Sequence, residues 1–382
     1  MDSFGNKPRI LVIENSIDVT GALKSIARAT NDLKFFFDFL FILPTGSKGR
    51  HVIESMGHNV IDELPMKELS KRISSWIMYV PTLLVNTIKL RRLVKRNNIS
   101  VIHVNDLYNL LPVTMQMMGI RVPYICHVRF LPNRFPSFLL KFWINLHYRY
   151  AEKIIAVSTH VKLMLPPNPK IVVIHNELPE KEVHPLVIKK TRGIHENAFL
   201  YLSNFIKGKG QDYAIEAFSI IHHLLPDWKL RMAGGDMGMK KNKLFKMKLI
   251  ERAVELSIAN KIEWVEFVEL VEWEYKQADI ILNFSESESF SITCLEALYY
   301  SRPLIATDCG GPSEIINDGT TGIFVENRNI DAMANAMLQL ATDKKLREKM
   351  GTLARETVKE KFSKEKTSFR LRSIYEQIMA NR

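Results

Sequence analysis

The stretch ADIILNFSESESFSITCLEALYYSRPLIATDCGG, residues 278–311, places a helical segment between two short apolar runs. A strand, a helix and a second strand in this order form a βαβ unit, whose two strands lie parallel in one sheet. The turn and the helix between the strands carry three glutamates, Glu286, Glu288 and Glu296. The stretch therefore predicts an α/β fold with carboxylates close to the end of a strand.

The same alternation continues along the chain of 382 residues. Short runs rich in β-branched residues predict strands, and the segments between them have helical periodicity. The predicted strands are RILVIE, DFLFIL, HNVIDE, VIHVN, PYICHV, KIIAVS and KIVVIH, then FLYLSN, KLRMAG, IEWVE, DIILNF, PLIATD and GIFVE. This order favours two doubly wound α/β domains, each with a parallel sheet.

The segment between the two series, residues 176–198, combines two prolines with mixed charge and is typical of a linker. We therefore predict a Rossmann-like N-terminal domain over residues 1–184 and a second one over residues 185–364. The tail, residues 365–382, has apolar residues at helical spacing, among them Phe369, Leu371 and Tyr375. This helix could pack on either domain, including a return to the first one.

Composition narrows the class of protein. A chain of this length is too long for a single domain with one hydrophobic core. A content of 46% hydrophobic and 25% charged residues is typical of a folded protein. The three cysteines have no CxxC spacing, which predicts neither a disulfide framework nor a metal site. No apolar run approaches the roughly 20 residues of a membrane span, and the N-terminus lacks a signal layout. We expect a cytoplasmic protein.

The net charge of +12 is unevenly distributed. Residues 1–180 hold 23 Lys and Arg against 13 Asp and Glu, a net +10, and the rest hold 30 against 28, a net +2. The first half should therefore face an acidic partner: nucleic acid, anionic lipid or a phosphorylated substrate. The chain has no RRM, KH or helix-turn-helix pattern, so we expect no nucleic acid.

Two segments of the first half combine cations with apolar side chains: Lys67–Asn98 and Arg129–Tyr150. A basic aromatic face is typical of docking on a membrane surface. In the alternative, the apolar stripe is domain core and the charges solvate the other face. The first segment leaves both interpretations open. The second has aromatic residues such as Phe138, Phe142 and Trp143 among Arg129 and other cations, which favours an anionic inner-membrane surface.

The glutamates of the opening stretch can form a ligand site. Open α/β sheets bind ligands at the carboxyl ends of their strands, and the amides of a helix starting near residues 289–292 favour a phosphate. Glu288 precedes this helix and Glu296 lies about two turns in, so they are separated by roughly 12 Å, which suits a sugar–diphosphate–ribose. Each carboxylate can accept hydrogen bonds from two hydroxyls. The alternative is helix-start and surface acids, and we assign Glu286 to that class.

The spacing Glu288-Ser-Phe-Ser…Leu-Glu296-Ala resembles the E-x7-E pattern of retaining glycosyltransferases of family 4, the group 1 set with the GT-B fold. Three further segments resemble the same family: TDCGGPSEIINDGTTGIFV, AEKIIAVSTHVK with KIVVIHNE, and SNFIKGKGQDYAIEAF followed by PDWKLRMAGGD. The resemblance covers nearly the whole chain. It implies two Rossmann-like domains facing a central cleft.

The resemblance also implies an activity. It implies transfer of a hexose-type sugar from a nucleotide diphosphate sugar, with retention, to a glycan or lipid-linked acceptor in bacterial surface polysaccharide synthesis, such as lipopolysaccharide, O-antigen or capsule. The enzyme would be peripheral on the inner face of the cytoplasmic membrane. No DxD occurs in the chain, so we expect no metal or other cofactor. The alternative is a nucleotide-sugar-binding protein of the same fold with little or no transferase activity.

The resemblance assigns residues in the second domain. It places Glu288 on the donor sugar hydroxyls, Glu296 on the ribose and Lys209 on the diphosphate. Asn204 stands where the family has an arginine, which weakens phosphate binding unless Lys207 or another cation substitutes. The donor-binding turn is Ser289, Phe290 and Ser291, with serines where the family prefers glycine. Their amides can still bind phosphate if φ stays negative.

In the first domain the resemblance assigns two residues. Gly21 would lie in a turn near the donor phosphate and the acceptor, and its alternative is a simple strand–helix turn. His127 would lie beside the reacting sugar and orient it through a hydroxyl, whereas His103 is expected to be structural. Asp106 is the nearest candidate for a carboxylate nucleophile, but its position looks structural. The sequence therefore favours front-face displacement, with Lys209 and helix amides stabilising the departing diphosphate.

Overall fold

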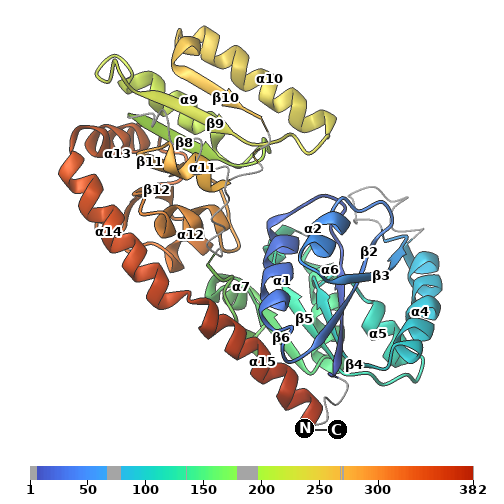
Figure 1. The fold of residues 1–382 in the computed structure, drawn as a ribbon. Helices are drawn as coiled ribbons and strands as arrows, with labels where there is room; N and C mark the ends of the chain where they lie inside the picture. The colour runs from blue at the N-terminus through green and yellow to red at the C-terminus, as the bar shows by residue number, and fades with distance from the viewer. Residues whose placement is uncertain are drawn as a thin grey trace. The chain divides into compact units, whose positions relative to one another are not determined.

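The computed structural model describes residues 7–66, 79–134, 136–178, 197–266, 268 and 271–381 (Figure 1). Two compact units divide the chain. Unit 1 comprises Met1–Glu177 and Lys364–Arg382, and unit 2 comprises Leu178–Ser363. The predicted boundary at residues 184 and 185 lies outside the described residues. Every strand predicted from the sequence is present, which confirms the α/β class.

Unit 1 is built on a parallel seven-stranded sheet in the order β3-β2-β1-β4-β5-β6-β7. Its buried strands are near-continuous runs of β-branched and aromatic residues, as expected for a sheet covered on both faces. The strands are β1 (Arg9–Glu14), β2 (Asp38–Pro44), β3 (Asn59–Leu64), β4 (Ile99–Asn105), β5 (Tyr124–Val128), β6 (Lys153–Ala156) and β7 (Ile171–Val173). The helices are α1 (Gly21–Asp32), α2 (Arg50–Ser55), α4 (Tyr79–Arg96), α5 (Leu111–Met117), α6 (Ser137–Tyr150), α7 (Thr159–Met164) and α15 (Lys364–Ala380).

The C-terminal helix α15 belongs to unit 1, which resolves the alternative left open by the sequence. It packs against α1 and β4 and buries Leu371 and Tyr375 in the unit 1 core. The Tyr375 hydroxyl lies 2.6 Å from Nδ1 of His103, so the helix is joined to the sheet by a buried polar contact. Phe369, predicted on the apolar face, is instead 70% exposed.

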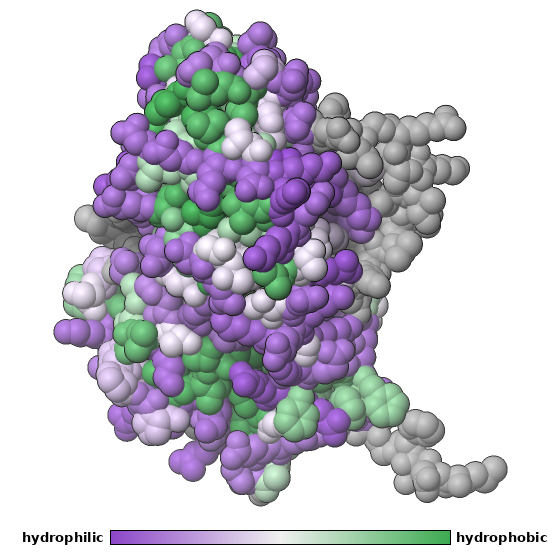
Figure 2. All heavy atoms as spheres, turned by 90° about the vertical axis from the view of Figure 1, so that its left-hand side faces the viewer, coloured by the Kyte–Doolittle hydropathy of each residue, from purple (hydrophilic) through white to green (hydrophobic). Residues whose placement is uncertain are grey.

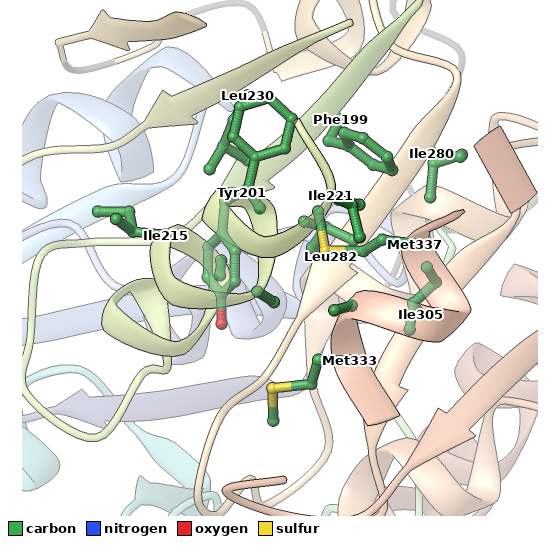
Figure 3. Packing of buried hydrophobic residues seen from close by; sticks show 14 of the residues in the cluster. Phe199, Tyr201, Ile215, Ile221, Leu230, Ile280, Leu282, Ile305, Met333 and Met337 are labelled. Carbon is green, nitrogen blue, oxygen red and sulfur yellow. The ribbon is translucent and has the colours of Figure 1, made fainter. Parts of the chain in front are cut away.

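Unit 2 is built on a parallel six-stranded sheet in the order β10-β9-β8-β11-β12-β13. Its core joins β8, β9, β11 and β12 to α9 and α13 through side chains that include Phe199, Leu230, Leu282 and Met337 (Figure 3). The strands are β8 (Ala198–Leu202), β9 (Lys229–Ala233), β10 (Ile262–Val265), β11 (Ile280–Asn283), β12 (Leu304–Thr307) and β13 (Gly322–Val325). The helices are α9 (Gln211–Ile221), α10 (Lys240–Glu255), α11 (Val271–Lys276), α12 (Ile292–Tyr299), α13 (Ile330–Thr342) and α14 (Lys344–Lys361).

Both sheets reverse their winding direction at one place. In unit 1 this switch point lies between β1 and β4, and in unit 2 it lies between β8 and β11. In open α/β sheets, ligands usually bind outside the carboxyl ends of the strands at such a switch point. The residues directly after β1, β4, β8 and β11 are therefore the first candidates for a functional site.

The molecular surface carries several apolar patches. Figure 2 shows green apolar side chains gathered in groups on one face of the molecule, with hydrophilic residues between them. Exposed single apolar residues are normal in folded proteins. An apolar patch alone therefore identifies no binding surface, and a second property such as charge is needed.

Candidate functional site

Two of the predicted residues meet at the switch point of unit 2. Lys209 follows β8 and Glu288 follows β11, and Lys209 Nζ lies 2.7 Å from Glu288 Oε1. The Ser285 hydroxyl donates to the same carboxylate oxygen at 2.9 Å. The Glu288 side chain is 14% exposed, so the pair is shielded but accessible. The structure thus brings together the cation that the resemblance assigned to the diphosphate and the carboxylate that it assigned to the sugar hydroxyls.

The loops that carry this pair are held together by a residue that sequence reasoning missed. The Tyr201 hydroxyl donates to the Lys209 carbonyl and accepts from the Phe284 amide, which lies 2.7 Å away. Gly210 has φ +80°, and a Cβ there would lie 2.1 Å from the Phe284 carbonyl oxygen. Only glycine therefore allows the loop after β8 to lie this close to the end of β11. No sequence motif marks Tyr201, which lies within a buried strand.

The backbone of Glu288 is bonded on both sides to the loop after β12. Its amide donates to the Cys309 carbonyl at 3.1 Å, and its carbonyl accepts from the Gly311 amide at 2.9 Å. A Cβ on Gly311 would lie 2.3 Å from Phe290 Cα. Gly311 of the TDCGGPSE segment thus allows a close approach of the two loops, which holds the Glu288 backbone in place.

Ser291 adopts the glycine-like conformation of the family pattern although it has a side chain. Its φ is +78°, so the condition of a negative φ, on which the sequence argument for phosphate binding rested, is not met. As the N-cap of α12, its hydroxyl accepts from the Cys294 amide at 3.4 Å and from Asn283 Nδ2 at 2.9 Å. The hydroxyl is therefore directed to the end of β11, and these contacts offset the strain of positive φ.

The other residues of the turn contribute differently. Phe290 is buried and packs edge-to-face on Phe362, with the ring centroids 5.6 Å apart, so its side chain belongs to the core. Ser289 beside it is half-buried. Whether their amides bind a phosphate stays a prediction. The helix begins within the predicted range, at Ile292.

Glu296 is the fifth residue of α12, so it lies about one turn into the helix rather than the two turns predicted. Its side chain is largely buried, and the Tyr275 hydroxyl donates to Glu296 Oε2 at 3.3 Å. Tyr275 stacks on Tyr300, with the centroids 5.2 Å apart. The separation of Glu296 from Glu288 along one donor remains a prediction.

Asn204, at the position of the family arginine, connects two loops. Its side-chain oxygen accepts from the Gly235 amide at 3.3 Å, and its carbonyl accepts from Gln211 Nε2 at 2.8 Å. It therefore joins the loops after β8 and β9 without supplying charge.

Glu286 forms a separate ion pair in the same unit. Its Oε2 lies 2.7 Å from Arg328 Nη2, and its Oε1 accepts from the Tyr213 hydroxyl at 2.8 Å. Hydrogen bonds from Arg328 and Tyr213 lower the pKa of Glu286, and the charge of Lys207 contributes to this shift. Lys207 therefore acts on this acid, which the sequence assigned to the surface.

In unit 1, His127 is held in one neutral tautomer. Its Nδ1 lies 3.2 Å from Arg129 Nη2, and a guanidinium can only donate, so Nδ1 accepts and the proton is on Nε2. Burial, then the charge of Arg129, hold the pKa of His127 well below its ordinary value of 6.5. Its Nε2 is buried and has no hydrogen-bond partner among the described residues. A buried donor without a partner is rare and is consistent with a group that acquires one from a ligand.

Arg129 is the functional candidate that the sequence placed wrongly. It was predicted on a basic aromatic surface, but only 8% of it is exposed. Its Nη1 donates to the Ser25 hydroxyl at 2.9 Å and to Asn176 Oδ1 at 2.7 Å. Trp143, predicted on the same surface, is also buried. Arg129 thus cross-links α1, β5 and the segment after β7 beneath His127.

Gly21 is the first residue of α1 and is exposed. Thr20 caps this helix by accepting from the Leu23 amide at 3.2 Å. The preceding loop is organised by Glu14, whose Oε1 accepts from the Ser16 amide at 2.9 Å and the Ser16 hydroxyl at 2.6 Å. A carboxylate-centred turn therefore follows β1. Gly21 and His127 belong to unit 1, whereas the Lys209–Glu288 pair belongs to unit 2.

Comparisons with known proteins agree with this architecture. The family model described as Glycosyl transferases group 1 matches residues 185–357, and the one described as Glycosyltransferase Family 4 matches residues 64–177. The chain is 26% identical to N-acetyl-alpha-D-glucosaminyl L-malate synthase of Bacillus anthracis over 345 residues, which span 84% of this chain and 86% of that protein. It is also 26% identical to the lipopolysaccharide core biosynthesis mannosyltransferase LpsB of Rhizobium meliloti, over 45% of this chain and 49% of that protein.

Solved structures give the same fold. The crystal structure of Anabaena Alr3699/HepE in complex with UDP-glucose matches with a TM-score of 0.81, over 97% of this chain and 99% of that one. The two sequences are 18% identical, so this likeness establishes the two-domain fold alone.

Proposed function

This chain belongs to the group 1 glycosyltransferases with the GT-B fold, and we propose that it transfers a hexose-type sugar from a nucleotide diphosphate sugar to a lipid-linked or glycan acceptor. The observation that carries the proposal is the Lys209–Glu288 pair at the switch point of unit 2. A cation suits a diphosphate, and a carboxylate suits adjacent sugar hydroxyls. The buried Tyr201 and Gly210 contacts hold both groups in place before a ligand arrives.

The proposed reaction retains the anomeric configuration. The bond between the anomeric carbon and the diphosphate breaks, and a bond to the acceptor oxygen forms on the same face. The acceptor proton passes to the departing phosphate, and Lys209 stabilises the negative charge that develops there. His127 would donate from Nε2 to a sugar hydroxyl, because Arg129 fixes the proton on that nitrogen.

A carboxylate nucleophile receives little support in unit 1. Asp106 is half-buried, and its Oδ1 accepts from the Arg129 amide at 3.4 Å. Burial, together with the charge of Glu14, raises its pKa well above the ordinary value, so it favours the protonated form. A protonated carboxyl group is a poor nucleophile, which favours front-face displacement. The proposal includes no metal.

The acceptor is proposed to be lipid-linked and to belong to a bacterial surface polysaccharide such as lipopolysaccharide, O-antigen or capsule. The similarity to LpsB and the net charge of +10 in residues 1–180 support this choice. No helix among the described residues is long and apolar enough to cross a membrane. We propose that the enzyme is a peripheral protein on the inner face of the cytoplasmic membrane, where a lipid-linked acceptor would lie.

A second candidate function is donor binding without transfer. Asn204 favours it, because an amide replaces the second cation that would stabilise the leaving diphosphate. The two candidates share the donor site and differ only in turnover.

The first experiment is a thermal-shift screen against UDP-, GDP- and ADP-sugars. A specific donor at about 100 times its Kd should stabilise unit 2 by about 2.7 kcal/mol. Transfer to lipid extract with that donor should then fall by a factor of about 10² to 10³ in Glu288→Gln. Glu286→Gln, which changes a neighbouring acid paired with Arg328, is the matched control and should keep its activity. Full activity in Glu288→Gln would refute the assignment of Glu288 to the donor site. If the wild type bound a donor without any turnover, donor binding without transfer would be favoured.

A further inference from the structure

The exposed face of α4 changes character along its length. Residues 80–88 of the described helix expose apolar side chains that are 44% to 56% accessible: Val80, Leu84, Val85 and Ile88. In residues 89–96 all the exposed side chains are cations: Lys89, Arg91, Arg92, Lys95 and Arg96. Leu90 and Val94 on the opposite side pack into unit 1. The helix is therefore anchored to the domain while a segregated apolar and basic face remains uncovered.

The neighbouring helices extend this surface. In unit 1, α4 packs against α5, and α5 packs against α6. Met117 and Met118 are exposed at the end of α5, and Phe138 and Phe142 are exposed on α6 beside Lys141. None of the three helices contains an aspartate or a glutamate. No ion pair neutralises the five α4 cations within the described part of the chain.

We propose that this surface, formed by α4 with the exposed residues of α5 and α6, docks on an anionic lipid bilayer. The apolar half of α4 would enter the interface, and its basic half would contact lipid phosphates. Charge complementarity commits the proposal to an anionic surface, and the four apolar side chains favour a bilayer over a purely polar polyanion such as RNA. The role of this docking surface rests on the proposed function: it would bring the enzyme to the bilayer that holds a lipid-linked acceptor. Binding itself does not depend on transfer.

A rival surface exists on unit 2. Helix α10 is also rich in lysine and exposes Leu244, Met247 and Val254, but it contains Glu251 and Glu255. If net charge and exposed apolar residues alone determined docking, α10 would bind as well. The absence of acids on α4 is the property that separates the two surfaces, so α10 supplies the matched control.

The test is flotation of the full chain with vesicles of phosphatidylcholine, with or without about one third phosphatidylglycerol. The wild type should float only with the anionic vesicles, and less so at high salt. Arg91→Gln with Arg92→Gln should lower the partition about 30-fold, at roughly fivefold per charge. Leu84→Gln with Val85→Gln should lower it at least about tenfold. Lys241→Gln with Lys243→Gln on α10, which removes the same charge, should leave it unchanged.

Several results would overturn the proposal. They are no flotation of the wild type, an equal loss in the α10 variant, or RNA that binds at the same salt and displaces the protein from vesicles. Each α4 variant should keep the thermal stability of the wild type, because the altered side chains are exposed. Vesicle binding without any sugar transfer would refute the proposed function and leave the docking surface intact. Transfer to a soluble acceptor without vesicle binding would refute the docking surface and leave sugar transfer intact.

Discussion

Glu177 should make the stability of this protein fall as the pH rises toward 8. Its side chain is buried at the end of the first segment of unit 1, and Oε2 has no hydrogen-bond partner among the described residues. Burial, then the charge of Asp32, raise the pKa of Glu177 to about 8, against the opposing effects of Lys364, Arg28 and Arg129.

The direction of the change in stability follows from the protons that Glu177 binds in the folded and the unfolded protein. In the unfolded chain the carboxyl ionises near its ordinary value of 4.5, whereas in the folded protein it keeps its proton to about pH 8. Its contribution to stability is therefore fully present below about pH 4.5 and is lost as the pH rises through 8. The difference between the two pKa values corresponds to at most about 5 kcal/mol of stability. Relaxation around the ionised carboxylate reduces the expected loss of stability to about 3 kcal/mol.

The variant Glu177→Gln isolates this effect, because glutamine keeps the shape of the protonated acid but does not ionise. Urea unfolding at a series of pH values should find the two proteins within about 1 kcal/mol near pH 5. At about pH 8.5 the variant should be more stable by about 3 kcal/mol. Glu152→Gln, an exposed carboxylate of the same unit, should follow the wild type. Parallel curves for wild type and Glu177→Gln would show that Glu177 ionises as it does in water, and the reasoning would be wrong.

Two further predictions concern the site residues. The variants Ser291→Gly and Ser291→Ala both lack the hydroxyl and differ only by a Cβ at φ +78°. The glycine variant should therefore be more stable in urea by about 1 kcal/mol. An alanine variant of equal or greater stability would contradict the strain argument. Histidine-selective ¹⁵N NMR at pH 6 should find His127 neutral with its proton on Nε2, because burial and Arg129 lower its pKa. An imidazolium signal at that pH would contradict the assignment.

The fold was largely predictable because each strand is a separate apolar run between turn residues. Burial on both faces of a parallel sheet requires such runs, so each strand can be predicted from its own short segment of sequence. The partner of α15 was not predictable in the same way. An apolar stripe reports that a helix packs, but Tyr375 meets His103 across 272 residues, and this contact depends on the whole topology.

The candidate site was predictable only in part. Lys209 and Glu288 follow strands that flank a switch point, so their proximity follows from the strand order and the family pattern together. The positive φ of Ser291 was not predictable, because serine itself disfavours that conformation. Arg129 was misplaced for a similar reason. A buried guanidinium needs partners such as Ser25 and Asn176, which lie 104 and 47 residues away, and composition cannot indicate them.

The pairing of Lys209 with Glu288 has a consequence for how a donor would bind under the proposed function. A diphosphate competes for Lys209, and it would leave the Glu288 carboxylate with the Ser285 hydroxyl as its remaining side-chain donor. A half-buried carboxylate that loses a charged partner costs about 1–3 kcal/mol. Sugar hydroxyls can replace that partner, whereas a nucleoside diphosphate without a sugar cannot. The ion pair of the free protein therefore favours the complete donor over the spent nucleotide, and it re-forms as the nucleotide leaves.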